Sequence, residues 1–159
     1  TDFSYTDSRG SIWLAPKGTI SDGASIPRVF WTYIGGPLSG LYRKASIIHD
    51  YYCDTRSRPA GDVHRVFYEG LLQSGVRSSK AWVMYQAVAL FGPNWAPSTP
   101  SGCGDGEQIN LADCVENFGS SAPLETPQSP TPENLEKFYQ KLHDEGYGAE
   151  AEALRASVD

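Results

Sequence analysis

The stretch SIIHDYYCDTRSRPAGDVHRVF, Ser46–Phe67, decides the fold that this sequence predicts. Its first part has apolar residues at helical spacing up to Asp54, and a helical pattern restarts at Pro59, a residue favoured in the first turn of a helix. A short polar loop joins the two parts, and helices joined by such a loop pack as antiparallel neighbours. The stretch therefore predicts an antiparallel helix pair over residues 41–74, which Gly75 ends.

Each helix of the pair has one apolar face. The faces consist of Leu41, Ala45, Ile48 and Tyr52 in the first helix, and of Val63, Val66, Phe67 and Leu71 in the second. A third helix, from about Ser79 to Leu90, is apolar nearly all round, which is typical of a helix in the middle of a core.

The N-terminal segment, residues 3–20, predicts two short strands around the turn Asp7–Gly10. One helical turn is expected after Pro27. The fold class is therefore α+β and mainly helical, with an antiparallel helix pair, a third buried helix and a small N-terminal β-hairpin.

The composition changes after the third helix, where seven prolines fall between residues 93 and 132. Thr131 and Pro132 then form a helix start, Gly146 ends that helix, and residues 149–158 predict a short last one. We expect a core domain at residues 1–97, an irregular arm or linker at 98–130, and an acidic helical tail at 131–159.

Charge and composition exclude some classes of function. Residues 1–97 carry a net charge of +3 and residues 98–159 a net charge of −9, whereas nucleic-acid binding needs a dense basic face. We therefore expect no nucleic-acid partner, and a tail that is either solvated or docked on the body. No apolar run is long enough to span a bilayer. No signal peptide is visible, yet the chain starts at Thr1, so secretion or delivery to the cell envelope stays open.

The three cysteines do not define a compartment. Cys103 and Cys114 bracket a Gly-rich loop and are able to pair under oxidising conditions, which leaves Cys53 over.

We expect a polar site between the two helices of the predicted pair. His49 lies four residues after Ala45 and borders the buried face, and Asp62 lies in the first turn of the opposing helix. We expect the two side chains to meet, because the end of one helix opposes the start of the other. A carboxylate on one imidazole nitrogen orients the ring, so that the other nitrogen activates water.

A cation site is expected beside this pair. Asp50 is turned about 100° from His49 around the helix, and Asp22-Gly23 in the segment SDGASIP offers a carboxylate and turn carbonyls. Calcium binds such oxygens readily. The alternatives are a core histidine at 49, a helix-end charge at Asp62 and a plain turn at Asp22-Gly23.

Residues 12–95 resemble a family of phage- and prophage-associated proteins of uncharacterised function. The resemblance rests on the patterns P-x-G, D-x-A-S-I-P, H-D-Y and M-Y-x-A-V-x-x-F-G, and on a family pattern D-x-x-F, which this chain has in the longer form D-x-x-x-x-F at Asp62–Phe67. The arm and the tail lie outside it.

The order D-G-x-S, H-D and D-x-x-F is similar, more distantly, to the secreted phospholipases A2. That resemblance implies His49 as general base, Asp62 as the acid that orients it, and Asp22 and Asp50 as calcium ligands. Ala24 and Ile48 stand where those enzymes have cysteines. The implied reaction is phospholipid ester hydrolysis. Three aromatic residues then either touch a lipid or membrane surface or belong to the core: Phe30, Trp31 and Tyr33.

Two rival classes remain. One is a zinc-dependent hydrolase of another bond, such as a peptidoglycan link, with ligands drawn from His49, Asp50, Asp62 and His64, although Asp62 and His64 face apart on a helix. The other is a non-enzymatic phage structural or accessory protein. The sequence has no Gly-x-Ser-x-Gly elbow, P-loop or dinucleotide fingerprint.

Overall fold

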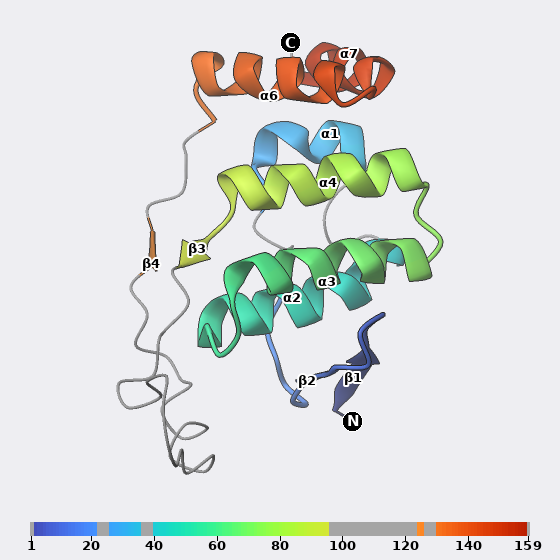
Figure 1. The fold of residues 1–159 in the computed structure, drawn as a ribbon, viewed down its shortest axis with the longest axis vertical. Helices are drawn as coiled ribbons and strands as arrows, with labels where there is room; N and C mark the ends of the chain where they lie inside the picture. The colour runs from blue at the N-terminus through green and yellow to red at the C-terminus, as the bar shows by residue number, and fades with distance from the viewer. Residues whose placement is uncertain (1, 22–25, 36–39, 96–123, 126–129, 159) are drawn as a thin grey trace, which may run out of the picture.

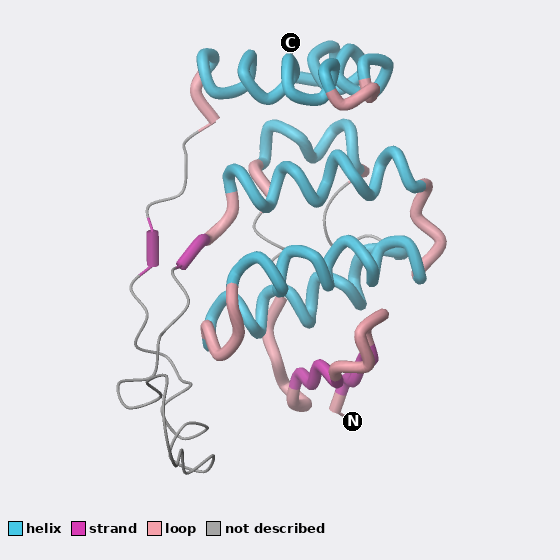
Figure 2. The backbone as a smooth tube through the Cα atoms, viewed as in Figure 1, coloured by secondary structure: helices cyan, strands magenta, loops and turns pink. Residues whose placement is uncertain are grey.

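The structure is a computed structural model that describes residues 2–21, 26–35, 40–95, 124–125 and 130–158. Its elements lie in layers, with the N-terminal hairpin at one end and the helix pair above it (Figure 1). Next come α4 (Ser78–Phe91) and α1 (Trp31–Ile34), and the two C-terminal helices lie at the other end. Figure 2 shows that short loops join most of the helices. This arrangement confirms the mainly helical α+β class with a small N-terminal hairpin.

The hairpin consists of β1 (Phe3–Thr6) and β2 (Ile12–Ala15), paired antiparallel with Phe3 opposite Ala15. Asp7 fixes the turn, because its carboxylate accepts hydrogen bonds from the backbone N–H groups of Arg9 and Ser11, each at 2.9 Å. It also accepts bonds from Trp13 Nε1 at 2.9 Å and from Arg65 at 3.1 Å. Burial alone raises the pKa of Asp7, but these hydrogen bonds outweigh burial and lower it.

Asp7→Ala should lower the free energy of unfolding by about 2 kcal/mol, because buried donors lose a charged acceptor. Urea unfolding followed by far-ultraviolet circular dichroism measures the change. The exposed Asp54 provides the control, and Asp54→Ala should stay within about 0.5 kcal/mol of the parent. Equal losses in the two variants would mean that Asp7 does not organise the hairpin.

The helix pair consists of α2 (Arg43–Thr55) and α3 (Ala60–Gln73), which pack against each other (Figure 1). Arg56 ends α2 in the left-handed region, at φ 51°. The two helices approach closely at Gly70, where an added Cβ would lie 3.1 Å from the Ala45 Cβ. The expected antiparallel neighbours are therefore present.

Leu41 corrects the expected apolar face of the first helix. It lies in the 3-10 turn η2 (Gly40–Tyr42), before α2 begins, and it is 53% exposed. The other three residues of that face, Ala45, Ile48 and Tyr52, are buried as expected.

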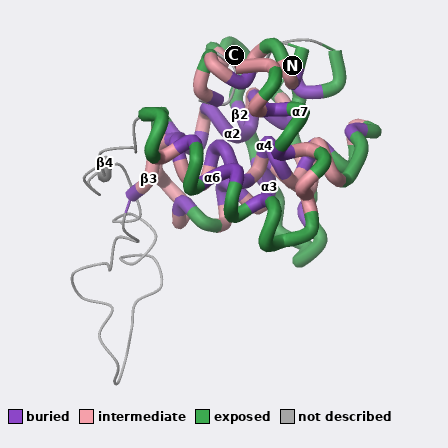
Figure 3. Tube along the Cα trace, turned by 90° about the horizontal axis from the view of Figure 1, so that it is seen from above, coloured by how far each residue is buried: buried purple, intermediate pink, exposed green. Residues whose placement is uncertain are grey.

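The third helix, α4 (Ser78–Phe91), is central as expected, with buried residues along most of its length (Figure 3). After it, β3 (Asn94–Trp95) pairs antiparallel with β4 (Leu124–Glu125). The helical turn expected after Pro27 consists of η1 (Arg28–Phe30) and α1 (Trp31–Ile34). Phe30 is a core residue, buried to 1% exposure, while Trp31 and Tyr33 pack partly buried against that core.

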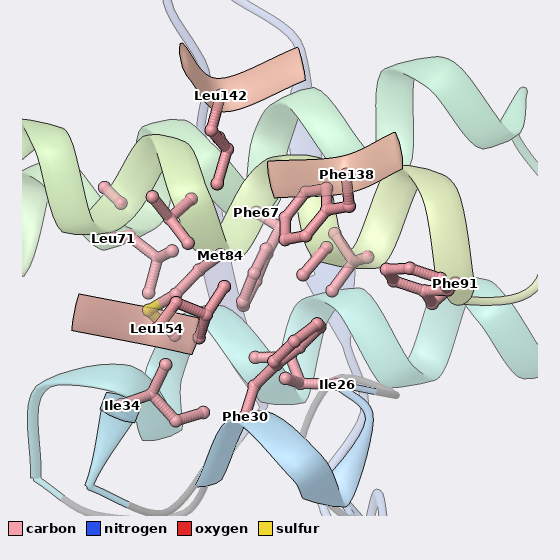
Figure 4. Close-up of a cluster of buried hydrophobic side chains, with 14 of the residues drawn as sticks. Ile26, Phe30, Ile34, Phe67, Leu71, Met84, Phe91, Phe138, Leu142 and Leu154 are labelled. Atoms are coloured by element: carbon pink, nitrogen blue, oxygen red, sulfur yellow. The ribbon is translucent and has the colours of Figure 1, made fainter. Parts of the chain in front are cut away.

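The C-terminal helices are α6 (Pro132–Asp144) and α7 (Gly148–Val158). The Thr131 side chain caps α6 by accepting a bond from the Asn134 N–H at 3.3 Å. Both helices contribute to the same apolar cluster as α1 and α4 (Figure 4). Their fully buried members of that cluster are Phe138, Leu142, Ala151 and Leu154. Apolar packing therefore docks the acidic tail on the body.

Candidate functional site

His49 of α2 and His64 of α3 form a buried pair between the two helices. The His49 ring is 0% exposed and His64 is 3% exposed. His49 Nε2 lies 2.9 Å from His64 Nδ1, which is hydrogen-bond distance. Phe67 packs against the His49 ring with centroids 5.0 Å apart, and Trp95 lies at 6.3 Å from the His64 ring. The helix pair thus brings two imidazoles together in an apolar enclosure.

The expected pair of His49 and Asp62 is not formed. The Asp62 side chain is 40% exposed and faces Arg9 at 3.5 Å and Arg65 at 3.9 Å. Asp62 and His64 lie two positions apart on α3, so only one of them faces α2. The structure turns His64 inward and leaves Asp62 at the surface.

A signal in the sequence distinguishes the two. In the pattern D-x-x-F the acid stands three residues before the phenylalanine, but His64 is three residues before Phe67 and Asp62 is five before it. Residues three apart lie on one face of a helix. Counting back from the buried Phe67 therefore selects His64 as the residue that faces His49.

Asp50 lies beside His49 and is 5% exposed. Its Oδ1 is 3.7 Å from His49 Nδ1, and its Oδ2 accepts a hydrogen bond from Ser21 Oγ at 2.6 Å. Ser21 directly precedes Asp22, which lies outside the described residues. The contact holds Ser21, the first residue of the SDGASIP segment, at Asp50.

Metal ligands are otherwise sparse in this region. Within the part of the chain that the structure describes, no three His, Cys, Asp or Glu side chains are grouped so that they could hold a metal ion. Asp62, one of the four residues named for the alternative zinc site, faces Arg9 and Arg65. A calcium site formed by Asp50 with Asp22 extends beyond the described residues.

Cys53 lies one turn after His49 on α2. Its Sγ is 3.6 Å from His49 Nδ1 and 3.7 Å from Nε2, and the residue is buried. Cys53 forms no disulfide with any described residue. Cys103 and Cys114 lie outside the described residues, so their expected pairing is not addressed.

His64 is neutral at pH 7. Burial lowers its pKa to about 3, with a further lowering by His49, whereas the Pro93 carbonyl acts in the opposite direction. His64 Nε2 nevertheless forms no hydrogen bond of ordinary geometry with a described residue. The Pro93 carbonyl favours a ring N–H on His64, and Nδ1 of His64 already faces His49. We therefore assign the proton of His64 to Nε2. His49 then donates from Nε2, and its Nδ1 lone pair faces Asp50 and Cys53.

The pair is closed to solvent. Neither histidine lines the two clefts beside β1 or the cleft beside Tyr33 and Arg77. Within the same residues, no helix has both the length and the apolar character needed to cross a bilayer.

Two relatives are known from Sinorhizobium fredii (strain NBRC 101917 / NGR234). The uncharacterized protein y4jT is 54% identical over 99 residues, which cover 62% of this chain and 30% of y4jT. The uncharacterized protein y4iH is 35% identical over 159 residues, which cover 99% of this chain and 60% of y4iH. The chain thus spans less than two thirds of the length of either relative. No solved structure matches it.

A family model described as "Protein of unknown function (DUF1353)" matches residues 1–88. The matched segment contains the hairpin, both helices of the pair and most of α4. It therefore includes both histidines of the buried pair, together with Asp50. The chain belongs to the DUF1353 family of proteins of unknown function.

Proposed function

We propose that the chain is a calcium-dependent ester hydrolase with phospholipase A2-like chemistry, in which His49 activates water. The observation that supports this proposal is that the two ring nitrogens of His49 have different partners. Nε2 is held by His64 at 2.9 Å, and Nδ1 is directed toward Asp50 at 3.7 Å. A general base needs one fixed nitrogen and one nitrogen with a lone pair at the reacting centre.

His64 is the positioning residue in place of the expected acid Asp62. A neutral imidazole fixes the tautomer and orientation of His49, but it stabilises the protonated form less than a carboxylate does. The carboxylate of Asp50 partly compensates, because it lies on the side of Nδ1 where the proton arrives. We therefore expect slower hydrolysis than with a His-Asp pair.

Asp50 and Asp22 are the residues that would hold calcium in this proposal. The donor set fits a hard cation, since both groups are carboxylates and the Ser21 contact holds the start of the Asp22 segment at Asp50. Bound calcium would supply positive charge that stabilises the oxyanion of the ester.

The substrate class in this proposal is phospholipid at a membrane surface. The resemblance to phage- and prophage-associated proteins supports delivery to the cell envelope, where such esters are abundant. Trp31 and Tyr33 remain partly exposed and are available for lipid contact, whereas Phe30 belongs to the core. Substrate reaches His49 only if the enclosure opens, because that ring is completely buried.

This burial favours a second function, a non-enzymatic phage accessory protein. In that case the two imidazoles satisfy each other inside the helix pair, and they stabilise the fold without reacting.

Hydrolysis of phosphatidylglycerol and phosphatidylethanolamine vesicles separates the two functions. With added calcium the parent chain should release fatty acid, and His49→Asn should reduce the rate by about 10²–10⁴-fold, the usual contribution of a general base. Asp50→Asn should raise the calcium concentration needed for half-maximal rate. Asp62→Asn is the matched control and should retain full activity, because that carboxylate is at the surface.

Melting temperatures accompany each assay. Absence of hydrolysis with calcium or zinc, together with a much lower melting temperature for His49→Asn, contradicts the hydrolase and supports the accessory protein. Activity that needs zinc instead of calcium supports the cell-wall or other zinc hydrolase.

A further inference from the structure

A groove runs along the N-terminal hairpin, away from the buried histidines. Its first part is a cleft of about 510 Å³ between β1 and the helix pair. A second cleft of about 550 Å³ shares Tyr5, Thr6 and Gln73 with the first and extends past the end of β1. Neither cleft is lined by His49, His64, Asp50 or Cys53.

One wall of this groove is the edge of a strand. Every residue from Phe3 to Ser8 lines one of the two clefts, and no residue of β2 lines either. A strand face presents only alternate residues, so consecutive lining residues mean that the backbone edge faces the groove. Among the described residues β1 pairs only with β2, which leaves this second edge without a strand partner.

The other wall is one face of α3. Val66, Gly70 and Gln73 line it at helical spacing, and Gly70 contributes no side chain. Ala45 and Ile48 of α2 add apolar surface, and Leu72, 38% exposed, lines the second cleft. A strand laid along β1 would direct alternate side chains onto this shallow apolar wall.

The charge of the groove is asymmetric. Lys44 is the one charged residue that lines the first cleft, and it is exposed and makes no ion pair with any described residue. The acids of the second cleft are both engaged. Asp7 binds its own turn and Arg65, and Glu69 binds Ser8 and Arg65. Lys44, near the start of α2, therefore favours a ligand that carries a carboxylate.

We propose that this groove binds an extended peptide of a partner protein, which adds a strand to the free edge of β1 and places a carboxylate at Lys44. Backbone hydrogen bonds give such a complex its affinity, and side-chain pockets give its specificity. The four residues of β1, Phe3–Thr6, provide an edge of about 13 Å, at about 3.3 Å per residue. This interaction is independent of the proposed hydrolase.

A phage-displayed library of random heptapeptides with free carboxyl ends tests the proposal on the full chain. Enriched peptides should alternate apolar and polar residues and carry a carboxylate near one end. Synthetic copies with that carboxyl end amidated, or with the acidic side chain neutralised, identify its source. N-methylation of alternate backbone nitrogens on the pairing edge should weaken binding at least tenfold, because it removes donors to β1.

Two variants localise the site. Lys44→Ala should abolish the preference for the carboxylate, whereas Lys17→Ala, an exposed hairpin lysine outside both clefts, should not. Binding should also slow amide hydrogen exchange at residues 3–6. No enrichment, equal binding of the N-methylated peptides, or protection elsewhere in the chain overturns the proposal. A stable dimer with protection confined to β1 also overturns it and assigns the edge to a second copy.

Discussion

Phe138→Ala should lower the free energy of unfolding by about 3–5 kcal/mol, the range for truncating a fully buried phenylalanine. Phe138 of α6 is 0% exposed, and its ring lies 5.6 Å from that of Phe30 and 5.5 Å from that of Phe91. Figure 4 shows the three phenylalanines in the same apolar cluster. The alanine variant removes two of the aromatic contacts between the acidic tail and the body.

Urea unfolding at pH 7 measures this loss, with Lys137→Ala as the control. Lys137 is the neighbouring residue, its side chain is 69% exposed, and it pairs only with Glu133 one turn earlier. An exposed i, i+4 ion pair contributes about 0.3–0.5 kcal/mol. Similar small losses in both variants would show that the tail folds apart from the body.

Local signals explain which parts of the fold the sequence predicts. The turn at Asp7–Gly10, the loop before Pro59 and the cap at Thr131 each depend on a few neighbouring residues, so the hairpin, the helix pair and α6 follow from the sequence. Leu41 shows the limit, because a short 3-10 turn before α2 changes the direction of its side chain. Periodicity cannot register such a turn.

The candidate site depends on tertiary packing, which is harder to read. His49 was predictable, because it borders an apolar helical face. Its partner depends on how α3 is rotated about its axis, and a rotation by two residues exchanges Asp62 for His64. The core position of Phe67 fixes that rotation. From the sequence we expect Asp62, because a carboxylate orients a histidine well. Burial instead favours His64 as the partner, because an imidazole is able to remain neutral.

Acidification should destabilise the protein well above the pH at which carboxylates titrate, and His64 should account for much of the loss. The pKa of His64 is about 3 in the fold, against an ordinary histidine value of 6.5. Between these values the unfolded chain binds a proton that the native chain does not bind. Native stability at this residue is therefore complete above pH 6.5 and falls as the pH drops toward 3, by at most about 1.4 kcal/mol per pH unit.

Unfolding free energies measured from pH 7 to 4.5 isolate this effect, because Asp7 and Glu69 have lowered pKa values and titrate below that range. The loss should reach about 3 kcal/mol at pH 4.5. His64→Gln should be less stable at pH 7 but should lose less stability on acidification, because glutamine fills the site without titrating. His143→Gln, at an exposed histidine paired with Glu152, should keep the parental pH dependence. If the unfolding free energies of the parent and of His64→Gln fell equally with pH, His64 would gain its proton equally in the folded and unfolded chains. The lowered pKa of His64 in the buried pair would then be wrong.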